Sequence, residues 1–117
     1  MKISYFAFGS NLSSARLLER LPEASKHCVA FLQQHQLYWH KKGRDLSGKC
    51  DIAFTGNPED TVYGVVYMMT HSDRQELDAY EGAGIGYERR DIQVTALHGE
   101  VIEVFTYYAL EIDRRRQ

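Results

Sequence analysis

The chain has 117 residues, 44% hydrophobic and 26% charged, a balance typical of one globular domain that buries a core without disulfides or metal. Its formal net charge of −2 gives no broad electrostatic reason to bind nucleic acid or an anionic membrane. No apolar stretch is long enough to cross a bilayer and no secretory signal pattern opens the chain, so we expect a single cytoplasmic domain over residues 1–117.

Cysteine and histidine usage predicts no metal site. Cys28 and Cys50 are the only cysteines, and we expect both to be reduced thiols buried as small apolar residues. No histidine has a spacing to cysteine or acidic residues that is typical of metal ligands, so we expect no metal and no other cofactor. The histidines, interpreted as structural or solvent-facing, are His27, His35, His40, His71 and His98.

A strand followed by a polar loop is predicted within residues 3–12. The loop Gly9-Ser10-Asn11 follows the strand directly, and a helix pattern comes next. Gly9 can adopt backbone angles closed to other residues, and N–H groups at a helix start have no intrahelical partner. Such a loop can hold an anion or a developing oxyanion, although a plain strand-to-helix turn has the same pattern. The strand residues alternate, with Ile3, Tyr5 and Ala7 on one face and Ser4, Phe6 and Phe8 on the other.

The next part of the chain alternates between helical and extended patterns. A short helix is predicted within residues 13–21, and Pro22 ends it. Two extended segments follow at His27–Leu32 and Gln36–His40, joined by polar residues. Residues 41–45 have the composition of an exposed basic turn.

A hairpin is predicted between residues 50 and 69. Strand patterns at Cys50–Thr55 and Val62–Met69 flank a turn-forming stretch at residues 56–60. The second arm is apolar almost throughout, which indicates a central strand buried on both faces. Gly64 within it predicts a bulge or a close approach of another backbone.

A second helix is predicted from about residue 72 to Glu81, before Gly82. Ser72 and Gln75 have capping-box spacing, and Thr70 is a competing N-cap. Strands at Tyr87–Leu97 and Glu100–Ala109 then flank His98-Gly99. The pattern therefore predicts an α+β fold, with about five to seven strands in a mixed, closed or nearly closed β-barrel and two or more short helices.

Glu81 is the strongest candidate for acid–base chemistry. At the last turn of a helix, the negative end of the helix dipole disfavours the ionised carboxylate, and partial desolvation would raise its pKa further. Such a glutamate is a better proton acceptor near neutral pH, although an exposed helix-end glutamate has the same sequence pattern. Asp78 lies one helical turn earlier and can share a face with Glu81, as a surface residue or as a supporting partner.

The order of these motifs resembles the γ-glutamylcyclotransferase family, which includes γ-glutamylamine cyclotransferases and short bacterial relatives. The opening strand and loop match the family's Tyr-Gly-Ser-Asn-Leu type motif, with Phe8 where Tyr is usual. The segment at residues 62–67 resembles its Val-x-Gly-x-x-Tyr strand, and Glu81-Gly82 stands where the family has its catalytic glutamate. The resemblance covers nearly the whole chain.

The resemblance implies an enzyme that converts a γ-glutamyl amine or a γ-glutamyl amino acid to 5-oxoproline and the free amine, without metal. The substrate's own α-amine attacks the γ-carbonyl, so no covalent enzyme intermediate is needed. It implies Glu81 as general acid/base, the residues from Phe8 to Leu12 at the substrate, and Tyr87 and Tyr107 lining the pocket. The implied substrate-binding residues are Phe8, Gly9, Ser10, Asn11, Leu12, Tyr87 and Tyr107.

Two other classes of function compete with this reading. One is a non-catalytic module that binds a small carboxylate on the same fold, although a carboxylate ligand gains nothing from a nearby unpaired Glu81. The other is a barrel that binds single-stranded nucleic acid on aromatic side chains, which the acidic net charge disfavours. We expect a small-molecule γ-glutamyl substrate, no nucleic-acid or membrane partner, and a monomer or weak homodimer.

Overall fold

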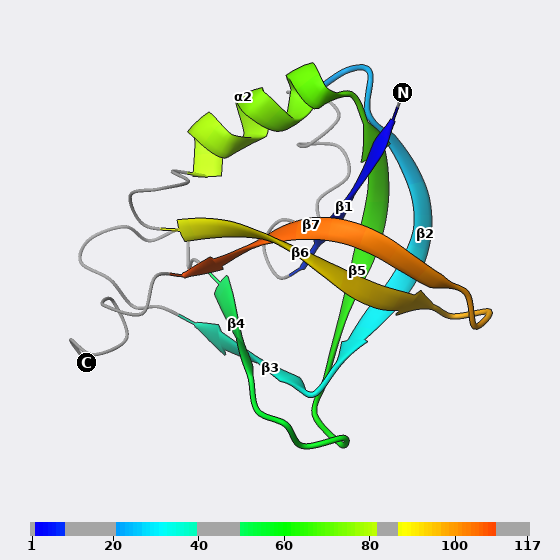
Figure 1. The fold of residues 1–117 in the computed structure, drawn as a ribbon, viewed down its shortest axis with the longest axis vertical. Coiled ribbons are helices and arrows are strands. Elements are labelled where there is room, and N and C mark those ends of the chain that lie inside the picture. The colour runs from blue at the N-terminus through cyan, green and yellow to red at the C-terminus, as the bar shows by residue number, and fades with distance from the viewer. Residues whose placement is uncertain (1, 9–20, 40–49, 82–86, 110–117) are drawn as a thin grey trace.

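The computed structural model describes residues 2–8, 21–39, 50–81 and 87–109. Within these residues the chain forms seven strands and one helix (Figure 1). The elements are β1 (Ile3–Ala7), β2 (Ser25–Gln33), β3 (His35–Trp39), β4 (Cys50–Phe54), β5 (Thr61–Met69), α2 (His71–Glu81), β6 (Tyr87–Ala96) and β7 (Val101–Ala109). The helix predicted within residues 13–21 lies outside the described residues.

Five strands pair into a sheet that closes on itself. The order is β1–β5–β2–β6–β7, and β7 returns to β1 through a parallel pairing at Tyr5 and Phe105. The buried hydroxyl of Thr106 strengthens this junction by donating to the backbone oxygen of Phe6 at 2.8 Å. Every other pairing in the ring is antiparallel, so the sheet is mixed, as the sequence predicted.

The predicted hairpin of residues 50–69 is wrong. β4 pairs with β3 in a separate two-stranded sheet, while β5 pairs with β1 and β2 inside the ring (Figure 1). Gln34 redirects the chain from β2 into β3 with a left-handed φ of 64°. Its N–H donates to the backbone oxygen of Asp60 at 2.7 Å, and its carbonyl accepts from Thr55 N–H at 2.7 Å. Tertiary hydrogen bonds thus separate two arms that are consecutive in sequence.

Two apolar clusters lie on opposite faces of the ring strands. Phe6 and Phe8 of the first strand segment belong to one cluster, with Val66, Val94 and other buried residues. Tyr5 and Ala7 belong to the other, which also contains Leu77 of α2. The alternation predicted for residues 3–8 is therefore confirmed, and one face of β1 packs beneath the helix while the other packs into the first cluster.

The central strand β5 runs so close to β1 that one position admits no side chain. A Cβ at Gly64 would lie 2.3 Å from the backbone oxygen of Ala7 and 2.8 Å from the Phe6 ring. The predicted close backbone approach is confirmed, and the bulge of this region lies instead in β2, between Lys26 and Cys28.

The helix α2 begins with a reciprocal cap at Thr70. The Thr70 hydroxyl accepts from Asp73 N–H at 3.1 Å, and the Asp73 carboxylate accepts from Thr70 N–H at 3.3 Å. The alternative cap at Thr70 is therefore the correct one, and the prediction of Ser72 as the first cap residue is wrong. In the described part of the chain, no helix combines the length and apolar character needed to cross a membrane.

Candidate functional site

The C-terminal turn of α2 carries the predicted acid–base residue. Glu81 is the last residue of the helix, as predicted, and its side chain lies outside what the structure describes. The last turn contains no basic residue that would offset the negative end of the helix dipole. Leu77, only 1% exposed, anchors this turn in the apolar cluster beneath the helix. The backbone position of Glu81 is thus set by packing one turn earlier.

Asp78 connects this turn of the helix to two strands. The Tyr107 hydroxyl of β7 donates to Asp78 Oδ1 at 2.6 Å, and Arg89 Nη1 of β6 forms an ion pair with Asp78 Oδ2. Arg89 and Tyr107 are paired across the two strands, which brings both side chains to the same carboxylate. One carboxylate therefore ties α2, β6 and β7 together three residues before Glu81.

The hydrogen bond of Tyr107 limits what its hydroxyl can do for a ligand. A phenol has one proton and lone pairs on its oxygen, and here the proton is directed to Asp78. That proton is therefore engaged within the protein and is not offered to a ligand. Its ring is 3% exposed and packs edge-on against Tyr5, with centroids 5.9 Å apart.

The other predicted substrate-binding residues lie in three different settings. Phe8 is 5% exposed and packs in the apolar cluster with Phe6, at a centroid distance of 6.2 Å. Tyr87 is the first residue of β6, paired with Ala109 of β7 and two residues before Arg89. The stretch from Gly9 to Leu12 lies outside the described residues. The described part of the site therefore consists of the end of α2 and the facing ends of β6 and β7.

Other polar groups of the described residues have structural roles. His35 is buried, and its Nδ1–H donates to the backbone oxygen of Gln33 at 2.9 Å, so its Nε2 accepts from the Tyr108 hydroxyl at 3.0 Å. Burial raises the pKa of the Cys28 thiol, and the charge of Glu100 raises it further, which is the opposite of nucleophile activation. Within the described ranges, no group of three metal-ligating side chains comes together.

The contribution of Asp78 and Arg89 was underestimated from sequence. The sequence pattern places Asp78 on the same helix face as Glu81, as a surface residue or a supporting partner, and it predicts no role for Arg89. The available signal was the helical spacing between Asp78 and Glu81, together with a tyrosine and an arginine on strands that follow the helix. Their convergence depends on the register between β6 and β7, which the sequence pattern alone does not specify.

The fold and site define a mixed α+β protein in which a closed five-stranded sheet carries a helix ending in an acidic turn. Residues 5–117 match the model of the family described as "Gamma-glutamyl cyclotransferase, AIG2-like", and the chain belongs to this family. It is 35% identical over 108 residues to a gamma-glutamylcyclotransferase of Homo sapiens and 36% identical to that of Mus musculus. The match covers 88% of this chain and 57% of each relative, so the chain spans little more than half their length.

Solved structures agree with this family assignment. A structure of a gamma-glutamyl cyclotransferase superposes with a TM-score of 0.84 at 32% identity, covering 94% of this chain and 68% of that chain. The solution structure of an Arabidopsis thaliana protein superposes with a TM-score of 0.76 at 25% identity, covering 94% of this chain and 70% of that chain. The resemblance stated from the sequence motifs is therefore confirmed at the level of family and fold.

Proposed function

We propose that this chain is a cyclotransferase that converts a γ-glutamyl amine or γ-glutamyl amino acid to 5-oxoproline and the free amine. The observation that carries the proposal is Glu81, which ends a helix one turn after Asp78, in a chain that belongs to the γ-glutamyl cyclotransferase family. Asp78 in turn holds Tyr107 and Arg89, so the helix end that bears Glu81 is braced against the sheet.

The reaction needs proton transfer and positioning rather than an enzyme nucleophile. The α-nitrogen of the substrate forms a bond to the γ-carbonyl carbon, and the bond from that carbon to the leaving nitrogen breaks. The α-nitrogen loses two protons as it changes from an ammonium to the lactam N–H, and the leaving nitrogen takes up two protons and departs as an ammonium, so atoms and charge balance. Because the attack is intramolecular, folding of the substrate supplies much of the rate enhancement.

In this proposal Glu81 accepts a proton from the α-ammonium before the attack and donates a proton to the leaving nitrogen as the amide bond breaks. A general acid–base group of this kind contributes about 10² to 10⁴ in rate. Asp78 acts as a positioning residue, because its bonds to Tyr107 and Arg89 hold the last helical turn in place against β6 and β7. The loop from Gly9 to Leu12 is assigned to the substrate carboxylate or the oxyanion, as the family motif implies.

A direct product assay tests the proposal. The purified full chain and its Glu81→Gln variant are each given a panel of γ-glutamyl amines, γ-glutamyl dipeptides and glutathione, and 5-oxoproline is measured by mass spectrometry. We expect product from the wild type, and about 10² to 10⁴ less from the variant at unchanged melting temperature. The preferred leaving group then identifies the substrate class.

The matched control is Glu76→Gln, which removes an exposed carboxylate from the same helix. It should turn over the substrate as the wild type does. A wild type that forms no 5-oxoproline from any member of the panel, while these ligands still raise its melting temperature, would favour the non-catalytic binding module.

A further inference from the structure

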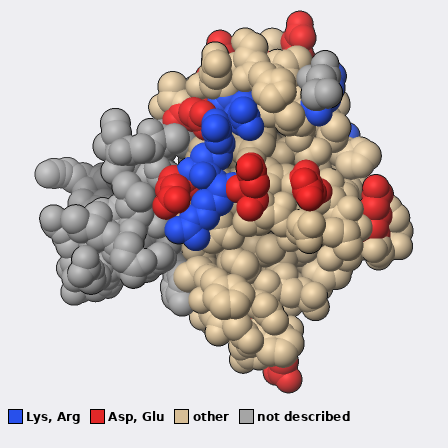
Figure 2. Space-filling model, viewed as in Figure 1, with Lys and Arg blue, Asp and Glu red and all other residues tan. Residues whose placement is uncertain are grey.

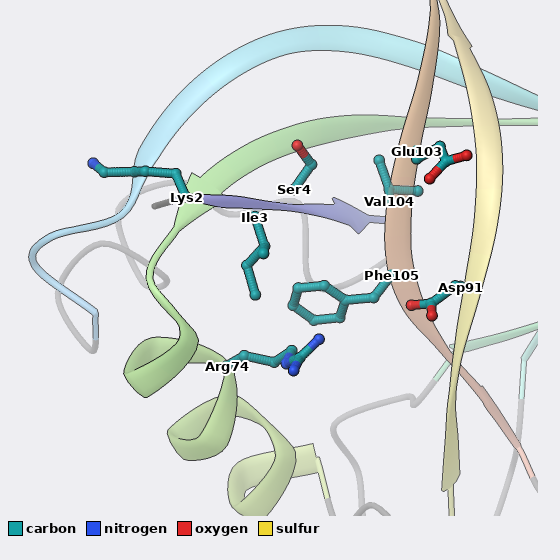
Figure 3. A pocket seen from close by; sticks show the side chains of 8 residues that line it. All are labelled: Lys2, Ile3, Ser4, Arg74, Asp91, Glu103, Val104 and Phe105. Atoms are coloured by element: carbon teal, nitrogen blue, oxygen red, sulfur yellow. The ribbon is translucent and has the colours of Figure 1, made fainter.

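A polar pocket lies beside the N-terminal half of α2. It has a volume of about 330 Å³, and β1, β6, β7 and α2 all contribute to its walls. Figure 3 shows the Arg74 side chain of α2 reaching into it, next to the Phe105 ring of β7. Arg74 precedes Glu81 by about two helical turns, so this pocket is separate from the proposed catalytic position.

Among the residues that the structure describes, Arg74 has no anionic partner. Its Nε is buried without a hydrogen-bond partner, and Arg74 forms no ion pair with any described residue. Its guanidinium carbon lies 5.6 Å from the centroid of the Phe105 ring, a cation–π contact that provides no hydrogen-bond acceptor for the buried Nε–H. A partly buried arginine normally has an acceptor for its N–H donors, so this one is suited to an external anion.

The strand register places an acid opposite this arginine. Along β6 and β7, Arg89 pairs with Tyr107, and two residues further Asp91 pairs with Phe105. Arg74 and Asp78 are one helical turn apart on α2, and the two strand pairs are two residues apart, so both separations are about 6 Å. Asp78 therefore lies over the pair of Arg89 and Tyr107. Arg74 lies over the pair of Asp91 and Phe105. The charges are reversed between the two positions. At the first, the acid Asp78 is on the helix and Arg89 is on the strand; at the second, Arg74 is on the helix and the acid Asp91 is on the strand.

The two positions differ in whether their charges meet. Asp78 and Arg89 are in contact, whereas Arg74 and Asp91 are not. In Figure 3 the Arg74 side chain ends beside the Phe105 ring, Ile3 lies near the same ring, and the Asp91 side chain lies by the neighbouring strands β6 and β7. The pocket is therefore lined by basic and acidic side chains around an apolar floor, and Lys2 and Glu103 add a second cation and a second anion to its lining. Figure 2 shows basic and acidic side chains next to one another on this face of the molecule.

We propose that this pocket binds a small zwitterion of the α-amino acid class. The ligand carboxylate accepts from the Arg74 guanidinium, its ammonium donates to the Asp91 carboxylate, and its side chain packs on Phe105 and Ile3. A simple carboxylate would pair with Arg74 but would be repelled by the negative charge of Asp91. A simple ammonium would pair with Asp91 but would be repelled by the positive charge of Arg74. A ligand with both charges matches Arg74 and Asp91 at the same time. This inference does not depend on the proposed cyclotransferase activity.

The test is a titration of the full chain followed by NMR, with the Arg74 Nε–H resonance and the Phe105 amide as reporters. The probes are L-alanine, propionate, which has only the carboxylate, and ethylamine, which has only the ammonium. We expect L-alanine to shift both reporters with a dissociation constant of about 1 mM, and each single-charge probe to bind about tenfold more weakly.

Substitutions locate the binding. Arg74→Gln and Asp91→Asn should each weaken L-alanine by about tenfold, read from the Phe105 amide. Arg90→Gln is the matched control, because Arg90 neighbours Asp91 in β6 but pairs with Glu88 and lies over the Tyr108 ring. It should leave binding unchanged.

Three results would overturn the proposal. The first is the absence of any shift with L-alanine at about a hundred times the expected dissociation constant. The second is propionate binding as tightly as L-alanine, which would make the pocket a plain anion site. The third is strong stabilising coupling between Arg74 and Asp91 in a double-mutant cycle without ligand, which would show that the two side chains satisfy each other.

Discussion

The two halves of α2 present opposite charges to the sheet, and the outcomes differ. In the C-terminal half, Asp78 meets a tyrosine hydroxyl and an arginine, so its carboxylate is fully engaged. In the N-terminal half, Arg74 meets an aromatic ring, and its buried Nε has no partner. A closed polar cluster braces the structure, whereas an open one leaves binding capacity for a ligand.

The cause of this difference is one pair of positions on β7. Tyr107 and Phe105 lie on the same face of the strand, two residues apart, and both pack near Tyr5. Tyr107 carries the hydroxyl that completes the Asp78 cluster, and Phe105 has none. The presence of this hydroxyl at Tyr107 and its absence at Phe105 therefore distinguish the braced C-terminal end of α2 from the open pocket beside its N-terminal half.

The largest effect is expected from Glu81→Gln. This variant should lose about 10² to 10⁴ in kcat while its L-alanine binding at the Arg74 pocket stays unchanged, because the two ends of the helix are separate sites. The product assay and the NMR titration check this on the same sample. Loss of both properties together would mean that the two ends form one site.

Breaking the closed cluster should affect both stability and turnover. Asp78→Ala leaves the Tyr107 hydroxyl and Arg89 without their acceptor, and we expect a loss of about 1–3 kcal/mol in the free energy of unfolding. Displacement of the last helical turn should reduce kcat by about 10- to 100-fold. Urea denaturation and the product assay measure the two effects.

A milder variant separates charge from hydrogen bonding at the same position. Asp78→Asn keeps an oxygen acceptor for Tyr107 but loses the ion pair with Arg89, so its effects should be smaller than those of Asp78→Ala. Equal stability and turnover of wild type and Asp78→Ala would contradict the bracing role.

Removal of the helix cap should loosen the N-terminal half alone. Thr70→Ala deletes the hydroxyl that accepts from Asp73 N–H, at an expected cost of about 1 kcal/mol in the free energy of unfolding. Hydrogen exchange should accelerate in the first turn of α2 and remain slow near Leu77. Uniform acceleration along the helix would show that α2 opens as one unit.

The smallest effect is expected at the open cluster. Arg74→Met loses only a cation–π contact and removes an unpartnered buried Nε, so the free energy of unfolding should change by no more than about 0.5 kcal/mol. Urea denaturation of this variant beside Asp78→Ala compares the two halves directly. A loss as large as that of Asp78→Ala would mean that Arg74 has a structural partner.

Local patterns in the sequence predicted most of the elements correctly. The alternation of residues 3–8, the helix ending at Glu81 and the two strands around His98-Gly99 are all observed, because each depends on neighbours a few residues away. The motif order also predicted the family, which the comparisons confirm. The roles of Glu81, Tyr87 and the loop at 9–12 stay predictions.

Only the tertiary structure decided which strands pair and which charges meet. β4 and β5 are consecutive in the sequence, and their pattern predicts a hairpin. Instead, the backbone of Gln34 hydrogen-bonds to residues 55 and 60, and β4 pairs with β3 rather than with β5. The Asp78 cluster and the Arg74 pocket depend on the register of β6 against β7. Helical and strand periods assign residues to faces, whereas pairing and register are set by contacts between residues far apart in the chain, which no local pattern contains.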